Sequence, residues 1–121
     1  MTVPGRRPQR LAEQIREEIS GLMVSGLKDP RIGFATITEV RLTPDLRQAR
    51  VLVSVLGTAE EQAESLEGFR AAASFIRRTL AQRMKLRRVP ELEFRLDRTE
   101  EQAARIEELL RQTHESDEPK E

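Results

Sequence analysis

The sequence contains no cysteine, tryptophan or tyrosine, and its 121 residues include one histidine and four phenylalanines. The absence of cysteine excludes a disulfide framework, a thiolate metal site and a cysteine nucleophile. The single histidine, His114, lies in a polar carboxyl-terminal stretch where nothing predicts a partner that would orient it as a base or ligand. No segment reaches the run of about 18 apolar residues that crosses a bilayer. We therefore expect a protein without cofactor, metal or membrane contact, and binding rather than catalysis.

Charge is distributed unevenly along a chain whose 21 basic and 21 acidic residues cancel. Residues 100–121 carry eight acids and three bases, so residues 1–99 hold the other 18 bases and 13 acids. A dense positive strip attracts a polyanion such as nucleic acid, although charge runs are also typical of solvated helix faces. Such a strip extends from Arg77 to Arg88, which holds Arg77, Arg78, Arg83, Lys85, Arg87 and Arg88 and no acid. A second basic group comprises Arg6, Arg7 and Arg10.

Hydrophobic periodicity predicts an α+β domain with the element order α-β-β-α-α-β-α. A helix is expected over residues 8–26, strands over 34–42, 47–56 and 91–97, and a turn at 43–46. Capping boxes at Thr58/Glu61 and Thr99/Gln102 mark the starts of a helical pattern reaching about residue 86 and of a short final helix ending near residue 110. Since helices after a hairpin cannot give a parallel doubly wound sheet, we expect a three-stranded sheet with helices packed on one face.

The long helical pattern is expected to contain a kink or a break. A straight helix over this span would be about 42 Å long, more than the roughly 30 Å diameter of a small domain. Ala72 and Ala73 favour continuous helix, whereas Ser74 can cap a second segment or bend the first by bonding to the preceding turn. We therefore predict a kink junction at Ala72, Ala73 and Ser74.

The residues favour recognition of phosphate and shape. Stacking platforms for bases are not expected, because the chain has no tyrosine or tryptophan and most of its four phenylalanines occupy expected core positions. Arginine suits phosphate because its planar fork meets two oxygens at once. The candidate RNA-binding residues are Arg70, Arg77, Arg78, Arg83, Lys85, Arg87 and Arg88, together with Arg6, Arg7 and Arg10. The alternative is a generic protein-interaction module without direct RNA contact.

Three regions are expected along the chain. Residues 1–7 have no apolar stretch and read as a flexible basic arm, residues 8–112 form the domain, and residues 113–121 read as a disordered acidic tail.

Short motifs occur along the chain in a consistent order. They are Asp29–Gly33, Thr38–Val40, Ala49–Val51, Ala72–Arg77, Leu86–Phe94 and Asp97. Each is weak alone, but together, from about Arg7 to Leu110, they resemble the ribosome-binding factor A family.

That resemblance implies a type II KH-like fold and a role in late maturation of the bacterial small (30S) ribosomal subunit. Members of the family bind free small subunits, assist processing of 16S rRNA, and are linked to its 5′-terminal helix and to growth in the cold. The resemblance further implies a cytoplasmic monomer whose partners are the 30S subunit, 16S rRNA, ribosomal proteins and other assembly factors.

One motif departs from the family pattern. Ordinary KH domains hold the nucleic-acid backbone on a G-x-x-G loop, which is absent from this sequence. The family carries Ala-x-Gly at its helix-kink-helix junction, and this chain has Ser74 in place of the glycine. We expect Ser74 to cap the second helical half, leaving amide groups that face phosphate.

Overall fold

The computed structural model describes residues 6–25, 27 and 29–117. Its elements are α1 (Arg6–Ser25), β1 (Ala35–Leu42), β2 (Gln48–Val55), α2 (Ala59–Met84), β3 (Glu91–Leu96) and α3 (Thr99–Asp117). The central strand, β2, pairs antiparallel with β1 and parallel with β3. The predicted α+β class and three-stranded sheet are confirmed.

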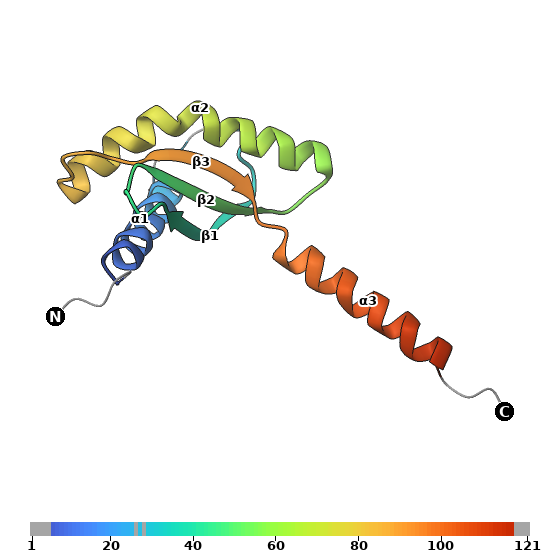
Figure 1. The fold of residues 1–121 in the computed structure, drawn as a ribbon. Coiled ribbons are helices and arrows are strands. Elements are labelled where there is room, and N and C mark those ends of the chain that lie inside the picture. The colour runs from blue at the N-terminus through green and yellow to red at the C-terminus, as the bar shows by residue number, and fades with distance from the viewer. Residues whose placement is uncertain (1–5, 26, 28, 118–121) are drawn as a thin grey trace.

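The hydrophobic core lies between one face of the sheet and two helices. Alternation along β2 places Ala49, Val51 and Val53 on this face, and all three are fully buried. Phe94 of β3 stacks on Phe69 of α2, with ring centroids 5.2 Å apart. Full burial of a valine or phenylalanine side chain contributes about 1.5–3 kcal/mol to the free energy of folding. Helix α1 covers β1 and α2 covers β3, so the opposite face of the sheet stays open (Figure 1).

The turn between β1 and β2 forms where the sequence predicts it. Thr43 donates its amide to the carbonyl oxygen of Gln48 at 3.0 Å, and Leu46 donates to Thr43 at 2.8 Å. Leu46 adopts a positive φ of 61°. The Asp45 carboxylate fixes the turn by accepting from the Thr43 hydroxyl at 2.6 Å and the Arg47 amide at 3.1 Å. These bonds lower the pKa of Asp45, the Thr43 hydroxyl having the larger effect.

Helix α2 is continuous, so the predicted break and the two-helix element order are wrong. The capping box at its start is confirmed, because Thr58 accepts from the Glu61 amide and Glu61 accepts from the Thr58 amide. The helix then runs for 26 residues, about 39 Å, through the exposed Ser74. Three successive alanines before Ser74 favour helix, and α2 is accommodated by arching along the length of the sheet (Figure 1).

Helix α3 projects away from the sheet and the other helices (Figure 1). Its side chains from Thr99 to Thr113 are all exposed. The predicted Thr99/Gln102 box is replaced by Asp97, whose Oδ1 accepts from the Thr99 amide at 2.9 Å. The helix also extends beyond its predicted end, to Asp117, through residues expected to belong to the tail.

At the other end of the chain, α1 includes Arg6 and Arg7, which the sequence assigns to the flexible arm. Residues 1–5 and 118–121, which make up the rest of the predicted arm and tail, lie outside the described residues, as does the side chain of His114.

Candidate nucleic-acid interface

Arg77, the first residue of the predicted strip, is engaged within the fold. Its Nε donates to the carbonyl oxygen of Pro90 at 3.2 Å, and its Nη2 donates to that of Val89 at 3.1 Å. The side chain is half-buried, and Pro90 is buried just before β3. The guanidinium thus holds the segment that returns from α2 to the sheet, and two of its donors are already used.

Arg70, another candidate RNA-binding residue, and Arg83 of the strip also have partners. Arg70 donates from Nη2 to the carbonyl oxygen of Phe94 at 3.4 Å, toward β3. Arg83 points the other way, toward α1, where its Nη1 lies 3.4 Å from Oε2 of Glu18. Arg83 thus lies on a different side of α2 from Arg70 and Arg77. An exposed pair such as Arg83 with Glu18 contributes only about 0–1 kcal/mol.

The other four cations of the strip are unpaired. Arg78, Lys85, Arg87 and Arg88 are exposed, and their side chains form no hydrogen bond or ion pair with any residue that the structure describes. Arg78 lies on the outer side of α2, about two turns before Lys85, which ends the helix in a left-handed conformation with φ 53°. Their donors are available to phosphate.

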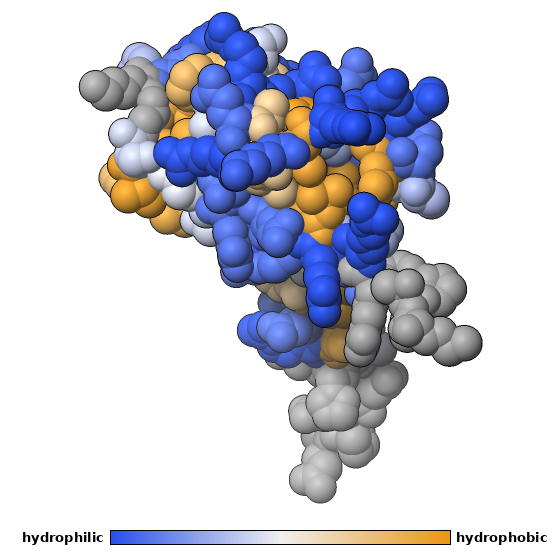
Figure 2. Space-filling model, turned by 90° about the vertical axis from the view of Figure 1, so that its left-hand side faces the viewer, coloured by the Kyte–Doolittle hydropathy of each residue, from blue (hydrophilic) through white to orange (hydrophobic). Residues whose placement is uncertain are grey.

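These cations adjoin further basic residues at the end of the sheet that carries the 43–47 turn. The Glu91 amide donates to the Arg47 carbonyl oxygen at 2.8 Å, which holds the 85–90 segment beside that turn. Figure 1 shows the start of α1 at the same end. Figure 2, which views the molecule from this end, shows mainly hydrophilic side chains with apolar patches between them. We name as the hairpin-end cluster the exposed residues Arg7, Arg10, Arg47, Lys85, Arg87 and Arg88.

Arg47 of this cluster is absent from the sequence prediction. It is a lone base two residues after Asp45, so charge density gives no signal there. It gains basic neighbours only because the first residues of β2 pair with those of β3, which places the turn beside the 85–90 segment. Arg7 and Arg10, which the sequence predicts, carry exposed side chains on α1. Arg6 is helical, but its side chain lies outside the described residues.

The comparison with known protein families decides the identity of the fold. The family model of ribosome-binding factor A matches residues 7–110, which is most of the chain. The chain belongs to the ribosome-binding factor A family.

Individual relatives agree with this assignment. Over 110 residues the chain is 47% identical to ribosome-binding factor A of Thermomicrobium roseum, covering 91% of this chain and 85% of that protein. The crystal structure of ribosome-binding factor A from Thermus thermophilus matches with a TM-score of 0.64 at 28% identity, covering 74% of this chain and 94% of that one. A homology model of the Thermus thermophilus factor, fitted into the cryo-EM map of a 30S–RbfA complex, matches with a TM-score of 0.62 at 29% identity, covering 74% and 94%.

The family junction at Ala72, Ala73 and Ser74 is not a binding site of the kind predicted. Ala72 and Ala73 are half-buried against the core, and Ser74 is exposed inside the continuous helix. A continuous helix uses its interior amides in its own hydrogen bonds, so none is left there for phosphate. The hypothesis that Ser74 caps a second helix is therefore wrong, and the unpaired cations lie farther along α2 and beyond its end.

The end of the molecule opposite the hairpin-end cluster is acidic. Helix α2 carries Glu60, Glu61, Glu64 and Glu67 in its first ten residues and no base there. From Arg70 to its end it carries four arginines and no acid. Glu60 and Glu61 in the first turn and Arg83 in the last turn interact favourably with the helix dipole. The same arrangement leaves a single positive end of the domain.

The described residues contain no group of three histidine, cysteine, aspartate or glutamate residues placed to hold a metal ion. Within the same residues, no helix has the length and apolar character needed to cross a membrane.

Proposed function

We propose that this protein is a non-enzymatic assembly factor that binds free 30S subunits through the hairpin-end cluster and Arg78. In this proposal it assists late maturation and processing of 16S rRNA near the 5′-terminal helix, in the bacterial cytoplasm and with particular importance in the cold. Membership of the ribosome-binding factor A family supports the ribosomal partner. The 30S complex named for the Thermus thermophilus factor supports the small subunit as the binding partner.

The observation that carries the RNA contact is the set of unpaired, exposed cations at one end of the fold. A guanidinium already paired with a carboxylate must break that pair to bind phosphate, whereas Arg78, Arg87 and Arg88 need not. Each phosphate neutralised by a cation releases counterions from the RNA, so affinity depends on salt. Phosphate contacts position a protein on a nucleic acid without reading bases, which suits a surface whose unpaired groups are arginine and lysine side chains. Phe69 and Phe94 lie in the core as expected, whereas Phe34 and Phe75 are exposed.

Replacement of Arg78, Arg87 and Arg88 by glutamine tests this surface. If each meets a phosphate, the slope of log affinity for 30S subunits against log salt should fall by about 2–3, at 0.7–0.9 per contact. The matched control replaces Arg98, Arg105 and Arg111, which are exposed at or within α3, and makes the same change in charge. Fluorescence titration of labelled protein with purified subunits at several salt concentrations gives both slopes.

An equal fall in slope for the two triple variants would show that total charge, not this surface, governs binding. Sedimentation of the tagged protein with cell extract gives a second measurement. The proposal requires migration with free 30S subunits, and migration only with complete ribosomes or with no ribosomal particle would contradict it.

A further inference from the structure

The outer edge of β1 has backbone groups without partners. β1 is an edge strand, because β2 lies on one side of it and no described strand lies on the other. Thr43 bonds to Gln48 of the neighbouring chain segment, so the backbone groups of alternate residues, Arg41 and Glu39, also face β2. The N–H and C=O groups of Val40 and Leu42 consequently point to the outer edge. Neither residue has another described partner for them.

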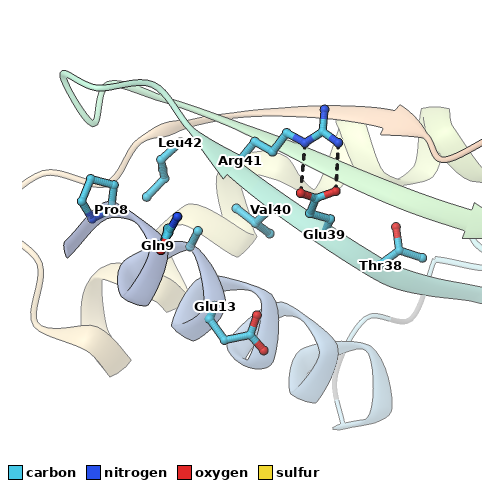
Figure 3. A pocket seen from close by; sticks show the side chains of 9 residues that line it. Pro8, Gln9, Glu13, Thr38, Glu39, Val40, Arg41 and Leu42 are labelled. Atoms are coloured by element: carbon cyan, nitrogen blue, oxygen red, sulfur yellow. Dashed lines mark hydrogen bonds and ion pairs between the residues drawn. The ribbon is translucent and has the colours of Figure 1, made fainter. Parts of the chain in front are cut away.

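A groove runs along this edge, between β1 and the first half of α1. It has a volume of about 400 Å³ and is lined by Pro8, Gln9, Ala12 and Glu13 of the helix and by residues 38–42 of the strand. Figure 3 shows the side chains of Val40 and Leu42 on the side of the strand that faces α1, and Glu39 paired with Arg41 away from it. The groove thus combines an apolar wall with free peptide groups.

The carboxylates at the groove favour a basic ligand. Two carboxylates and one cation, Glu13, Glu39 and Arg41, belong to its lining. Arg41 holds both oxygens of Glu39, whereas Arg16 contacts only Oε1 of Glu13, so Oε2 of the exposed Glu13 can still accept from a basic ligand. Phosphate would find no unpaired cation among the lining residues, in contrast to the hairpin-end cluster. Only an extended peptide offers donors and acceptors at the two-residue spacing of Val40 and Leu42.

A β-bulge interrupts the edge just before this stretch. The register of β1 with β2 shifts between Ile37 and Glu39, and the Thr38 hydroxyl donates to Oδ2 of Asp97 at 2.6 Å, with the carbonyl oxygen of Leu52 3.2 Å away. Bulges and charged residues protect sheet edges against unwanted pairing. This bulge limits pairing beyond Thr38 but leaves residues 39–42 straight, so the edge suits a short strand rather than a long one.

We propose that this groove binds a short, extended, basic peptide segment of a partner protein, which adds to β1 as a fourth strand. Its backbone bonds to Val40 and Leu42, alternate side chains pack toward Ala12, and a lysine or arginine lies near Glu13. The site adjoins the RNA-binding surface proposed above at the start of α1 and gives the protein a second, protein-directed contact.

Nuclear magnetic resonance with the full-length ¹⁵N-labelled protein tests the site. The probe is a synthetic nine-residue peptide of alternating valine and lysine. Addition of the peptide should shift the amide signals of Val40 and Leu42 and slow their hydrogen exchange. Two further peptides carry one N-methyl group each, on the central residue or on its neighbour. Because successive N–H groups of a strand face opposite edges, only one of the two should lose affinity, by about tenfold.

A pair of protein variants examines the charge of the rim. Glu13→Lys should weaken binding of the lysine peptide by about twofold to fivefold, as expected for an exposed ion pair. Glu17→Lys, on the same helix but outside the groove lining, should leave it unchanged. A peptide with threonine in place of lysine should bind both variants equally.

The proposal would be overturned if the two methylated peptides bound with equal affinity. It would also be overturned if the peptide shifted other amide signals but left those of Val40 and Leu42 unchanged. The same two amides shifting with protein concentration alone would identify a second copy of the chain as the occupant. Their shifting with an RNA fragment instead of the peptide would identify RNA.

Discussion

Replacing Arg77 by alanine should lower the stability of the fold, whereas the same change at its neighbour Arg78 should lower RNA affinity alone. Arg77 donates two hydrogen bonds to the carbonyl oxygens of Val89 and Pro90. Hydrogen bonds to charged groups contribute about 1.5–3 kcal/mol each when buried. Arg77 is half-buried and water can reach the vacated oxygens in part, so we expect a loss of about 1–3 kcal/mol in all.

For a domain of about 100 residues, that loss corresponds to a fall in Tm of about 5–15 °C, since the unfolding entropy is about 2.1 cal/mol/K per residue. Urea unfolding followed by circular dichroism measures the loss in free energy of unfolding. We expect an unchanged m value, because unfolding exposes the same surface in both proteins. Arg78→Ala should stay within about 0.5 kcal/mol of the original chain. If Arg77→Ala is as stable as the original and instead reduces the salt dependence of 30S binding, Arg77 serves phosphate and the assignment is wrong.

Two further predictions concern packing and acid stability. An alanine at Gly68 would place its Cβ 2.8 Å from Cγ1 of the buried Ile32, whereas an alanine at Gly21 of α1 meets nothing within 4 Å. Gly68→Ala should therefore unfold in urea about 1–3 kcal/mol more easily than Gly21→Ala, and equal stability would exclude the clash. The pKa of Asp97 is lowered by the hydroxyls of Thr38 and Thr99 and then by the Thr99 amide. Its stabilisation is present above its unfolded pKa of about 3.9 and is lost as pH falls through the lower folded value. Asp97→Asn should thus be less stable at pH 7 in urea unfolding and lose less stability between pH 5 and 2, and an unchanged acid profile would refute this.

The elements of the fold follow from local patterns in the sequence. Alternation along residues 47–56 predicts β2, and the Thr58/Glu61 box predicts the start of α2, because both signals depend on neighbours within four residues. The break at Ser74 is predicted from the length of the helix against the diameter of a compact domain. That argument fails because α2 arches along the sheet, so its length need not fit within the core.

The candidate site is less accessible to sequence reasoning. The periodicity of α2 shows which residues face the core, but it does not show which element lies on either side of the helix. Arg77 therefore reads as a surface cation, although β3 and the segment before it lie within its reach. Arg47 is the opposite case, because the sequence does not mark it as part of a basic surface. It gains basic neighbours only through the pairing of Gln48 in β2 with Glu91 in β3. Both outcomes depend on contacts between residues far apart in the sequence.

The polarity of α2 connects the stability of the domain with its orientation on RNA. Glu60 and Glu61 in the first turn and Arg83 in the last turn each interact favourably with the helix dipole, by about 0.3–1 kcal/mol per charge at an exposed helix end. Most of the cations beside the hairpin lie outside α2, so the positive end of the domain depends on how the elements pack together. The acidic amino end of α2 and the acidic first turn of α3 would be repelled by phosphate, which favours approach by the hairpin end. The distribution of charge over the domain would thus orient the protein before any specific contact forms.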